Sequence, residues 1–397
     1  MKIVILAETY SSNMGYIGNM LPKYLALEGC EVHLIVGDLP HNWQLDDFKT
    51  TYSENIFESG TAGTVTTHDG FTLHVLPHKF YGPWPFLVGL AATLRKLRPQ
   101  VVQVLGAIGW NPLTAAIMKP FVGYAMFTAS HNAKSTFPLA RGEGGIVAKI
   151  ACRLTRTLPG KLISMATEKC YAPTYDCAEI AWNWFGVSKK KVKLMYLGTD
   201  TEYFFPSNNL NDLKSRFKIR MSIGVGPEEL LFIYTGKMDE FKNPLILAEV
   251  VNKLRSKGYL VSALFIGDGS QKILIEKFQF CHLLPFLPYQ ELGAYYRAAD
   301  IGVWTGNEST SMIDAGGCGL PLVISSLCEY DYHIRGHGLK FIRNDLNSLE
   351  ATLISLMDKN HREAMSKLAA ERIQREFSWT AIARYRIADF TAATRLR

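Results

Sequence analysis

The sequence lacks the features that mark several large classes of protein. Its seven cysteines are odd in number and include no Cys-x-x-Cys pair, so they indicate neither a disulfide framework nor a zinc site. A reducing cytoplasm is therefore the expected environment. The basic residues give a formal net charge of only +7 and form no dense clusters with interleaved aromatics, so we expect no nucleic-acid partner.

Long apolar runs are also absent. No stretch reaches the length of about 18 apolar residues that a membrane-spanning helix needs. The N-terminal "MKIVILAETY" contains one Lys and soon becomes polar, which predicts a first strand and not a signal peptide. The nearest candidate, "WPFLVGLAATL" at 84–94, is predicted to be a core helix, and it leaves peripheral contact with a membrane surface open.

What the sequence does contain is ample material for large cores. A length of 397 residues, 48% of them hydrophobic and 20% charged, predicts two domains of roughly 200 residues each. Short β-branched runs alternate with helical patterns, as parallel sheets built from βαβ units require. The pattern stops at the polar stretch 207–229 and then restarts. We therefore predict an α/β protein with two Rossmann-like, doubly wound parallel-sheet domains that face a cleft, at 1–205 and 206–375, followed by a helical segment at 376–397.

In such folds, ligands bind where the strands end at their carboxyl side. The first strand-to-helix turn, "AETYSSNMGYIGNM", lacks the Gly-x-Gly-x-x-Gly fingerprint, which removes the main support for a nicotinamide or flavin role. Gly15 lies just before the predicted helix, where backbone N–H groups can approach an anion, although a packing turn would also need a glycine. His131 follows the strand in "FTASHNAKS" and is either a substrate contact or a structural histidine.

The corresponding turns of the second domain carry cations and glycines. "YTGKMDEFKNP" places Lys237 and Lys242 beside Gly236, and two cations over a glycine turn suit a diphosphate, although bare lysines are often only solvated. "FIGDGSQ" puts Gly267 at the next strand end, which is a weaker signal. We predict a phosphate-binding role for this group.

Two carboxylates precede a buried apolar run in "ESTSMIDAGGCGLPLVIS". A carboxylate accepts paired hydrogen bonds from vicinal hydroxyls, so we predict that Glu308 and Asp314 bind the hydroxyls of a ribose or a hexose. A helix N-cap with a solvated acid nearby would explain the same pair structurally.

The order of these segments resembles a known family. "GKMDEFKNP", "FIGDGS", "FLPYQELGAYYRAADIGVW" and "ESTSMIDAGGCGLPLVIS", followed by "FSWTAIARY", are similar to the C-terminal domain of the retaining GT-B glycosyltransferases of group 1 (family 4). "YLGTDTEYFFP" resembles the segment before the family's linker, so the likeness covers essentially the whole chain.

The resemblance implies a GT-B fold whose C-terminal helix crosses back to the N-terminal domain. It implies transfer of a hexose-type sugar, with retention, from a nucleotide diphosphate donor (a UDP- or GDP-sugar) to a hydroxyl of a small molecule, a glycan or a lipid-linked sugar. It implies no metal and no other cofactor, and the sequence has no Asp-x-Asp motif. The protein is expected in the cytoplasm, with peripheral membrane contact left open.

The resemblance also implies roles for single residues. Lys237 stands where the family usually has Arg, and it would bind the donor diphosphate together with Lys242. Asp314 in "DAGGCGLPLV" would bind the nucleotide ribose. His131 resembles the histidine near the reacting sugar, and Gly15 the glycine turn that approaches the donor phosphate and the acceptor.

The resemblance implies the sugar-binding role for Glu308. Asn307 and Ser309 are alternatives, because Glu308 and Asp314 are six residues apart here, whereas the two acids are about eight residues apart in the family. The predicted catalytic residues are His131, Lys237, Lys242 and Glu308. The predicted substrate-binding residues are Gly15, Gly236, Gly267, Asp314, Ser309 and Met312.

Other functions stay open on the same architecture. A nucleotide-sugar epimerase or a glycosyl phosphorylase would use a similar scaffold. The Asp at 314 and the Lys at 237 also leave room for a non-catalytic subunit that binds a nucleotide sugar. We expect the acceptor near the loops between Trp43 and Trp84 and near 140–145.

Overall fold

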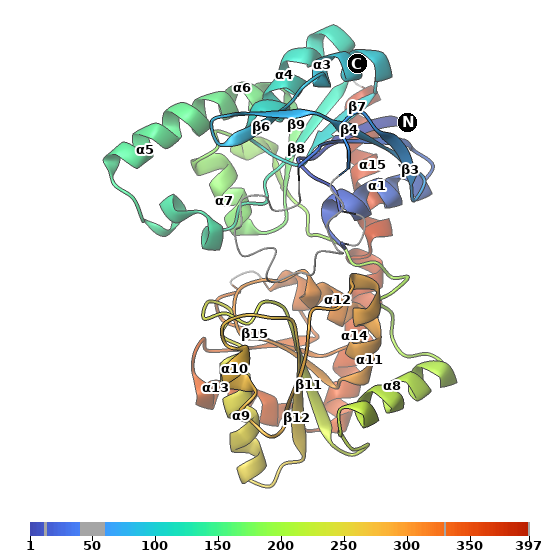
Figure 1. Ribbon diagram of the computed structural model, residues 1–397, viewed down its shortest axis with the longest axis vertical. Coiled ribbons are helices and arrows are strands. Elements are labelled where there is room, and N and C mark those ends of the chain that lie inside the picture. Colours follow the sequence, from blue (N-terminus) through green and yellow to red (C-terminus); the bar gives the residue numbers. More distant parts are fainter. Residues whose placement is uncertain (12–13, 40–59, 329–330, 396–397) are drawn as a thin grey trace. The chain divides into compact units, whose positions relative to one another are not determined.

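The computed structural model describes residues 1–11, 14–39, 60–328 and 331–395. They divide into two compact units, shown in Figure 1. The first holds the described residues of 1–197 together with 382–395, and the second is Gly198–Ala381. Each unit is built on its own largely parallel sheet with helical crossovers, so the predicted pair of Rossmann-like domains is confirmed.

The first sheet has the strand order β10-β9-β8-β7-β1-β2-β4-β3, and every neighbouring pair is parallel except β3 and β4. Its strands are β1 (Lys2–Leu6), β2 (Glu31–Gly37), β3 (Val65–His68), β4 (Phe71–Leu76), β7 (Val101–Val104), β8 (Ala125–Ala129), β9 (Thr167–Ala172) and β10 (Val192–Leu194). The direction in which successive strands are added reverses between β1 and β7, which makes this the switch point of the sheet.

The helices of the first unit supply the crossovers between these strands. They are α1 (Ile17–Leu27), α3 (Leu90–Leu97), α4 (Trp110–Val122), α5 (Ile146–Cys152), α6 (Leu158–Ala166) and α7 (Tyr175–Asn183). A short hairpin, β5 (His78–Tyr81) with β6 (Trp84–Leu87), precedes α3. The segment 84–94 therefore forms β6 and the start of α3, and its Leu87, Leu90 and Leu94 are buried in the core.

The second sheet is entirely parallel, in the order β13-β12-β11-β14-β15-β16. Its strands are β11 (Leu230–Thr235), β12 (Val261–Ile266), β13 (Cys281–Leu284), β14 (Ile301–Trp304), β15 (Leu322–Ser325) and β16 (Gly338–Phe341). Strands such as "VSALFI" are buried on both faces, which explains their continuous hydrophobic sequences. The switch point of this sheet lies between β11 and β14.

The second unit also contains most of the C-terminal helices. Its elements are α8 (Leu210–Ser222), α9 (Leu245–Ser256), α10 (Lys272–Ile275), α11 (Leu292–Ala298), α12 (Ser311–Gly317), α13 (Leu346–Ser355), α14 (Lys359–Glu376) and the start of α15 (Trp379–Arg395). In the described part of the chain, no helix is both long and apolar enough to cross a membrane.

The rest of α15 belongs to the first unit, where ionic contacts hold it on the sheet. Asp389 accepts hydrogen bonds from the ammonium groups of Lys169 (2.6 Å) and Lys193 (2.7 Å) and from the hydroxyl of Tyr171 (3.0 Å). Burial alone raises the pKa of Asp389, but the two lysine contacts outweigh it and lower the pKa overall. From Ile382 onward, the last helix is therefore an integral part of the first unit.

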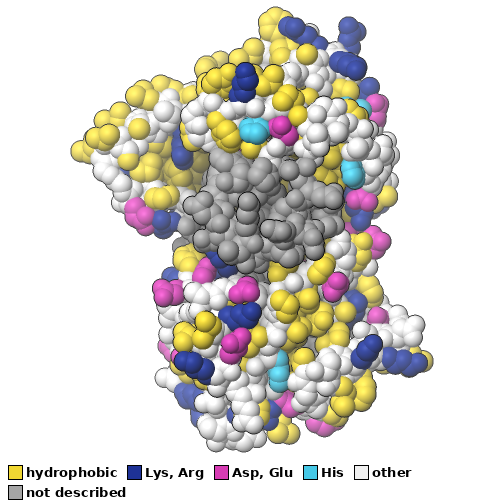
Figure 2. Space-filling model, in the orientation of Figure 1, with side chains coloured by type: hydrophobic (Ala, Val, Ile, Leu, Met, Phe, Trp, Pro, Cys, Tyr) yellow, Lys and Arg dark blue, Asp and Glu magenta, His cyan; other side chains and the backbone are white. Residues whose placement is uncertain are grey.

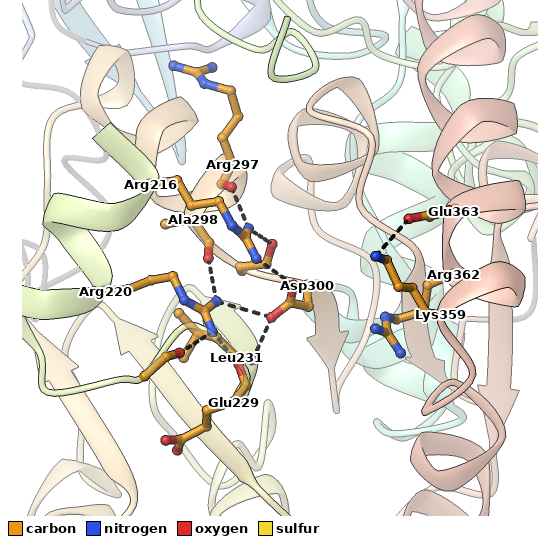
Figure 3. Close-up of polar contacts among 12 residues, drawn as sticks. Arg216, Arg220, Glu229, Leu231, Arg297, Ala298, Asp300, Lys359, Arg362 and Glu363 are labelled. Carbon is orange, nitrogen blue, oxygen red and sulfur yellow. Dashed lines mark hydrogen bonds and ion pairs between the residues drawn. The ribbon is translucent and has the colours of Figure 1, made fainter. Parts of the chain in front are cut away.

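A second ionic cluster joins α8 to the second sheet (Figure 3). Asp300, directly before β14, accepts hydrogen bonds from Arg216 (2.6 Å), from Arg220 (3.1 Å) and from the backbone N–H of Leu231 (2.8 Å). Arg220 also donates to the carbonyl of Ala298 (3.0 Å) and is almost fully buried. A buried guanidinium is tolerated only when its charge is compensated, so Asp300 is the partner on which this cluster depends.

Replacing Asp300 by alanine should lower the free energy of unfolding by about 3 kcal/mol, because two guanidiniums would lose their carboxylate in a largely buried place. Chemical denaturation of the purified chain measures this. The matched control is Glu363→Ala, which removes the partner of Lys359 in the exposed pair of Figure 3. The control should change stability by less than about 0.5 kcal/mol. Equal effects of the two changes would show that the cluster is not stabilising.

Candidate functional site

The candidate site lies at the carboxyl ends of β11 and β12. The turns that follow these two strands are in close backbone contact. Gly236 and Gly267 both have φ of 141°, in the region that favours glycine. A Cβ on Gly267 would lie 2.1 Å from the carbonyl oxygen of Gly236, and one on Gly269 would lie 2.5 Å from that of Met238. Packing in the protein itself therefore requires glycine at 267 and 269, and the backbone conformation favours glycine at 236.

An open pocket lies over these turns. Its cavity volume, including the part open to solvent, is about 580 Å³. Four predicted site residues line it: Gly236, Lys237, Gly267 and Ser309. The others that line it are Thr235, Ile266, Asp268, Phe286, Leu287, Leu292 and Ser311. The pocket therefore lies at the carboxyl ends of β11 and β12 and before α12, beside the switch point of the sheet, where ligands of such folds bind.

The hydroxyl groups on one side of the pocket are held in a network. The indole N–H of Trp304 donates to the carbonyl of Thr235 (3.2 Å) and to the hydroxyl of Ser311 (3.0 Å). Ser311 and Ser309 share a hydrogen bond of 2.7 Å, and Thr235 shares one of 2.7 Å with the hydroxyl of Tyr296. Fixed hydroxyls of this kind can bind phosphate or sugar oxygens without reorganising first.

The two predicted lysines have different surroundings. Lys237 is exposed at the pocket, and its carbonyl accepts a hydrogen bond from the hydroxyl of Tyr234 (2.7 Å). Lys242 is half-buried, and its ammonium donates to the carbonyls of Asn307 (3.4 Å) and Glu308 (3.3 Å). Burial lowers the pKa of Lys242, and the neighbouring acidic groups oppose that shift. The structure thus brings Lys242 and Glu308 together.

Gly306 explains the altered spacing of the two acids. It stands eight residues before Asp314, at the spacing where the resembled family has its first acid. A Cβ on Gly306 would lie 2.7 Å from the Cα of Lys242, so a side chain has no room there. The nearest acid of this segment is therefore Glu308, two residues later.

Asp314 and Met312 lie inside the second unit. The carboxylate of Asp314 is buried, accepts a hydrogen bond from the hydroxyl of Thr199 (2.6 Å) and does not line the pocket. Burial raises its pKa to about 7, with a further contribution from Asp200, while hydrogen bonds from Thr199 and Tyr289 oppose the shift. The side chain of Met312 is part of the hydrophobic core, so a ligand could meet only its backbone.

The remaining two predicted residues belong to the first unit. His131 follows β8, and its Nε2 is buried without a hydrogen-bond partner among the described residues. Burial lowers its pKa to about 4, and the positive charge of Arg386 adds to the effect, so the imidazole is neutral at pH 7. Arg386 donates to the side-chain oxygen of Gln103 (2.9 Å). Gly15 directly precedes Tyr16, the N-cap of α1.

A second pocket, in the first unit, was not found from the sequence. It lies at the carboxyl ends of β1 and β7, the switch point of that sheet, and is lined among others by Glu8, Trp84, Trp110 and Asn111. Burial raises the pKa of Glu8. The sequence did contain one feature that could have predicted this pocket: the carboxylate of Glu8 directly after the apolar run of "KIVILAE".

Two further residues of the second-unit pocket lie within the sequence motifs but were not predicted as site residues. Asp268 stands between Gly267 and Gly269, and Ser311 opens α12. The part of the expected acceptor region at 43–59 lies outside the described residues.

Comparison with known proteins shows what this chain is similar to. The family model described as "Glycosyl transferases group 1" matches residues 229–359, which contain the whole pocket of the second unit. A D-inositol 3-phosphate glycosyltransferase from Mycobacterium marinum is 27% identical over 229 residues, which is 52% of this chain. This chain is similar to the group 1 glycosyltransferases over residues 229–359. It spans about half the length of the curated relatives it matches, 47% in the Mycobacterium protein.

Solved structures share the fold of this chain. Sucrose-phosphate synthase from Thermosynechococcus elongatus superposes with a TM-score of 0.71 at 15% identity, covering 100% of both chains. HepE from Anabaena, solved in complex with UDP and glucose, gives a TM-score of 0.66 at 14% identity and covers 99% of this chain and 100% of its own. The fold is therefore that of the GT-B glycosyltransferases, as the sequence motifs predicted.

Proposed function

We propose that this protein is a group 1 glycosyltransferase that moves a hexose-type sugar from a nucleotide diphosphate donor to an acceptor hydroxyl, with retention at the anomeric carbon. The observation that carries the proposal is the pocket of the second unit. There a cation, Lys237, two close glycine turns and the fixed hydroxyls of Ser309 and Ser311 gather at the switch point of a parallel sheet. This combination suits a sugar diphosphate, whose oxygens need both charge and donors.

The difficult step of the transfer is the departure of the diphosphate, which gains negative charge as the sugar becomes oxocarbenium-like. Lys237 is exposed and lines the pocket, so its positive charge would stabilise a diphosphate bound there. Lys242 lies beside the Glu308 segment and would supply a second positive charge. Backbone N–H groups of the glycine turns would complete the stabilisation of the leaving group.

The donor nucleotide is proposed to be a uridine diphosphate sugar in preference to a guanosine one. Support comes from HepE, which was solved with UDP and glucose. Phe286 and Leu287 give the pocket an apolar wall on which a base can pack. Asp314 is proposed to bind the ribose, which would require its carboxylate to exchange the hydroxyl of Thr199 for those of the sugar.

Retention without a protein nucleophile is part of the same proposal. The acceptor would attack the face from which the diphosphate leaves, and the departing phosphate would help to remove the acceptor proton. His131, neutral at pH 7, would donate a hydrogen bond to the reacting sugar. No metal ion is assigned a role, and lysines take the place of a cation on the diphosphate.

The acceptor is proposed to carry a sugar or another polyol. Trp84 and Trp110 give the first-unit pocket broad aromatic surface, and Glu8 can accept hydrogen bonds from hydroxyls. The curated Mycobacterium relative is named for a phosphorylated inositol. None of the three proteins compared above is named an epimerase or a phosphorylase, so nothing favours these alternatives.

Thermal unfolding with added nucleotides tests the donor side. UDP at about 100 times its dissociation constant should raise the unfolding midpoint by about 5 °C or more, because a ligand that prefers the native state adds about 2.7 kcal/mol there. Uridine without phosphates should give a much smaller shift, since it cannot meet the lysines. Absence of a shift with every nucleoside diphosphate would contradict the proposal.

Transfer itself is measured as release of the nucleoside diphosphate from its sugar. Slow release that is accelerated by an acceptor indicates a transferase, whereas an epimerase would convert the sugar without release. A stable nucleotide-sugar complex with no transfer to any acceptor of a broad panel would instead indicate a non-catalytic subunit.

A further inference from the structure

The surface of α5 and α6 is unusually apolar for the exterior of a protein. Together with the π-helical turn Arg153–Thr157, the two helices form one continuous helical segment, residues 146–166. Its outward side carries seven apolar side chains, each between 51% and 81% exposed, which we call the apolar ridge: Ile146, Val147, Ile150, Leu154, Leu158, Leu162 and Met165. Figure 2 shows the apolar side chains that gather over this protruding region of Figure 1.

The ridge is one face of the helical segment and is fixed in its outward direction. From Val147 onward its members are three or four residues apart, which places them on the same side of a helix. The opposite side carries Cys152, Gly160 and Ile163, all buried. A Cβ on Gly160 would lie 1.7 Å from the carbonyl oxygen of Phe185, so the helix is packed too closely to turn its apolar side inward.

Helix α4 extends the apolar surface beyond the ridge. Its Ile117 and Phe121 are 57% and 71% exposed. Between α4 and α6 runs a shallow groove lined mostly by apolar side chains, among them Leu113, Ile117, Leu162 and Met165. A continuous exposed apolar surface of this extent normally marks a place where something binds.

The charges around the ridge are of one sign. Lys149, Arg153 and Lys161 are exposed on the same helical segment, and residues 144–167 contain no Asp or Glu. The acids that flank the segment are paired: Glu143 with Arg141 (2.6 Å) and Glu168 with Lys119 (3.0 Å). The surface therefore joins apolar side chains with an excess of positive charge.

A neighbouring loop adds further positive charge. The backbone N–H of Ser188 donates to the side chain of Ser164 on α6 (3.0 Å). This contact brings the exposed Lys189 and Lys190 to the end of the same helix.

We propose that the apolar ridge docks on a membrane surface that contains anionic lipids. An interfacial helix buries its apolar side at the boundary of headgroups and acyl chains, while its cations meet the lipid phosphates. A second copy of this chain fits the surface less well. In a two-fold dimer the same patch meets itself, so Lys149, Arg153 and Lys161 would face their own like charges. No residue of the ridge lines either of the two pockets described above, and the test of the proposal requires no turnover.

Co-sedimentation of the full chain with lipid vesicles tests the proposal. Vesicles of phosphatidylcholine with about 30% phosphatidylglycerol should bind the chain at least tenfold better than vesicles of phosphatidylcholine alone. Raising the ionic strength from about 0.05 M to about 0.5 M should weaken the binding severalfold, since exposed charges are screened. Absence of binding to both kinds of vesicle, or equal binding to both, would overturn the proposal.

A pair of double variants tests the ridge itself. Leu154→Glu with Leu158→Glu should lower the binding to anionic vesicles at least tenfold, because two carboxylates would have to enter the interface. The matched control is Leu213→Glu with Phe217→Glu on α8, where both side chains are exposed to a similar degree, 55% and 58%. The control should bind like the wild type. Equal binding by the ridge variant would overturn the proposal.

The cations provide a variant that leaves the apolar side chains in place. Lys149→Glu with Lys161→Glu should reduce binding to anionic vesicles at least fivefold and remove most of its salt dependence. Thermal unfolding confirms that each variant is folded. A wild-type dimer that binds no vesicles, and that Leu154→Glu with Leu158→Glu converts to a monomer, would show that a second copy covers the ridge and would overturn the proposal.

Discussion

Replacing Lys237 by alanine should lower turnover about 100- to 1000-fold, as the loss of one charge-stabilising donor does in other active sites. The side chain is exposed at the pocket, so its removal leaves no cavity in the core. The fold should be spared, and the effect should appear in kcat, because the charge on the diphosphate develops during bond cleavage. Release of the nucleoside diphosphate from its sugar, followed by chromatography, measures the rate.

Two further variants show whether the loss of turnover is due to the positive charge at position 237. Lys277→Ala removes another exposed lysine of the second unit that does not line the pocket, and it should leave turnover unchanged. Lys237→Arg restores a cation and should recover much of the rate, since a guanidinium also binds phosphate oxygens. If Lys237→Ala turns over within a few-fold of the wild type, the lysine has no part in the mechanism.

Replacing Gly267 by alanine should destabilise the second unit by about 3 to 5 kcal/mol, from backbone strain at positive φ and from overpacking. Both causes are present at this position: φ is 141°, and the new Cβ would lie 2.1 Å from the carbonyl oxygen of Gly236. Chemical denaturation measures the loss. Nucleotide binding should fall with it, because the two glycine turns that form the pocket would have to separate.

Gly226→Ala is the matched control for the glycine substitution. Gly226 also lies in a turn of the second unit, but nothing stands within 4 Å of the Cβ that alanine would add. We expect a change of less than about 0.5 kcal/mol there. A Gly267 variant as stable as this control would mean that the close backbone contact can relax at little cost.

The alternation of strands and helices was readable from the sequence, and for a physical reason. Strands such as "LLFIYT" and "VSALFI" are buried on both faces, so their continuous apolar sequence predicts a parallel sheet. Polar residues directly after such strands predict a ligand-binding site. The turn at Gly236 and Lys237 was found in this way. The exposed apolar ridge was not, because a helix that is apolar on its outer side has the same sequence pattern as one that is apolar on its inner side.

Partners that are distant in the sequence could not be predicted. Asp314 was expected to face a ligand, yet its carboxylate bonds to Thr199, 115 residues earlier in the chain. His131 owes part of its lowered pKa to Arg386, near the other end of the chain. No local pattern records such contacts, because they are fixed only when the sheet and its helices assemble. The role of Asp314 at the ribose thus stays a prediction.

The close approach of Gly306 to Lys242 restricts how this protein can be redesigned. Installing a glutamate at 306, to restore the acid spacing of its relatives, would push the backbone of Lys242 outward by the width of a Cβ. The ammonium that reaches the carbonyls of Asn307 and Glu308 would move with it. Because the clash is with the backbone of residue 242, no exchange of the side chain at 242 relieves it, and an acid at 306 requires a shift of the backbone.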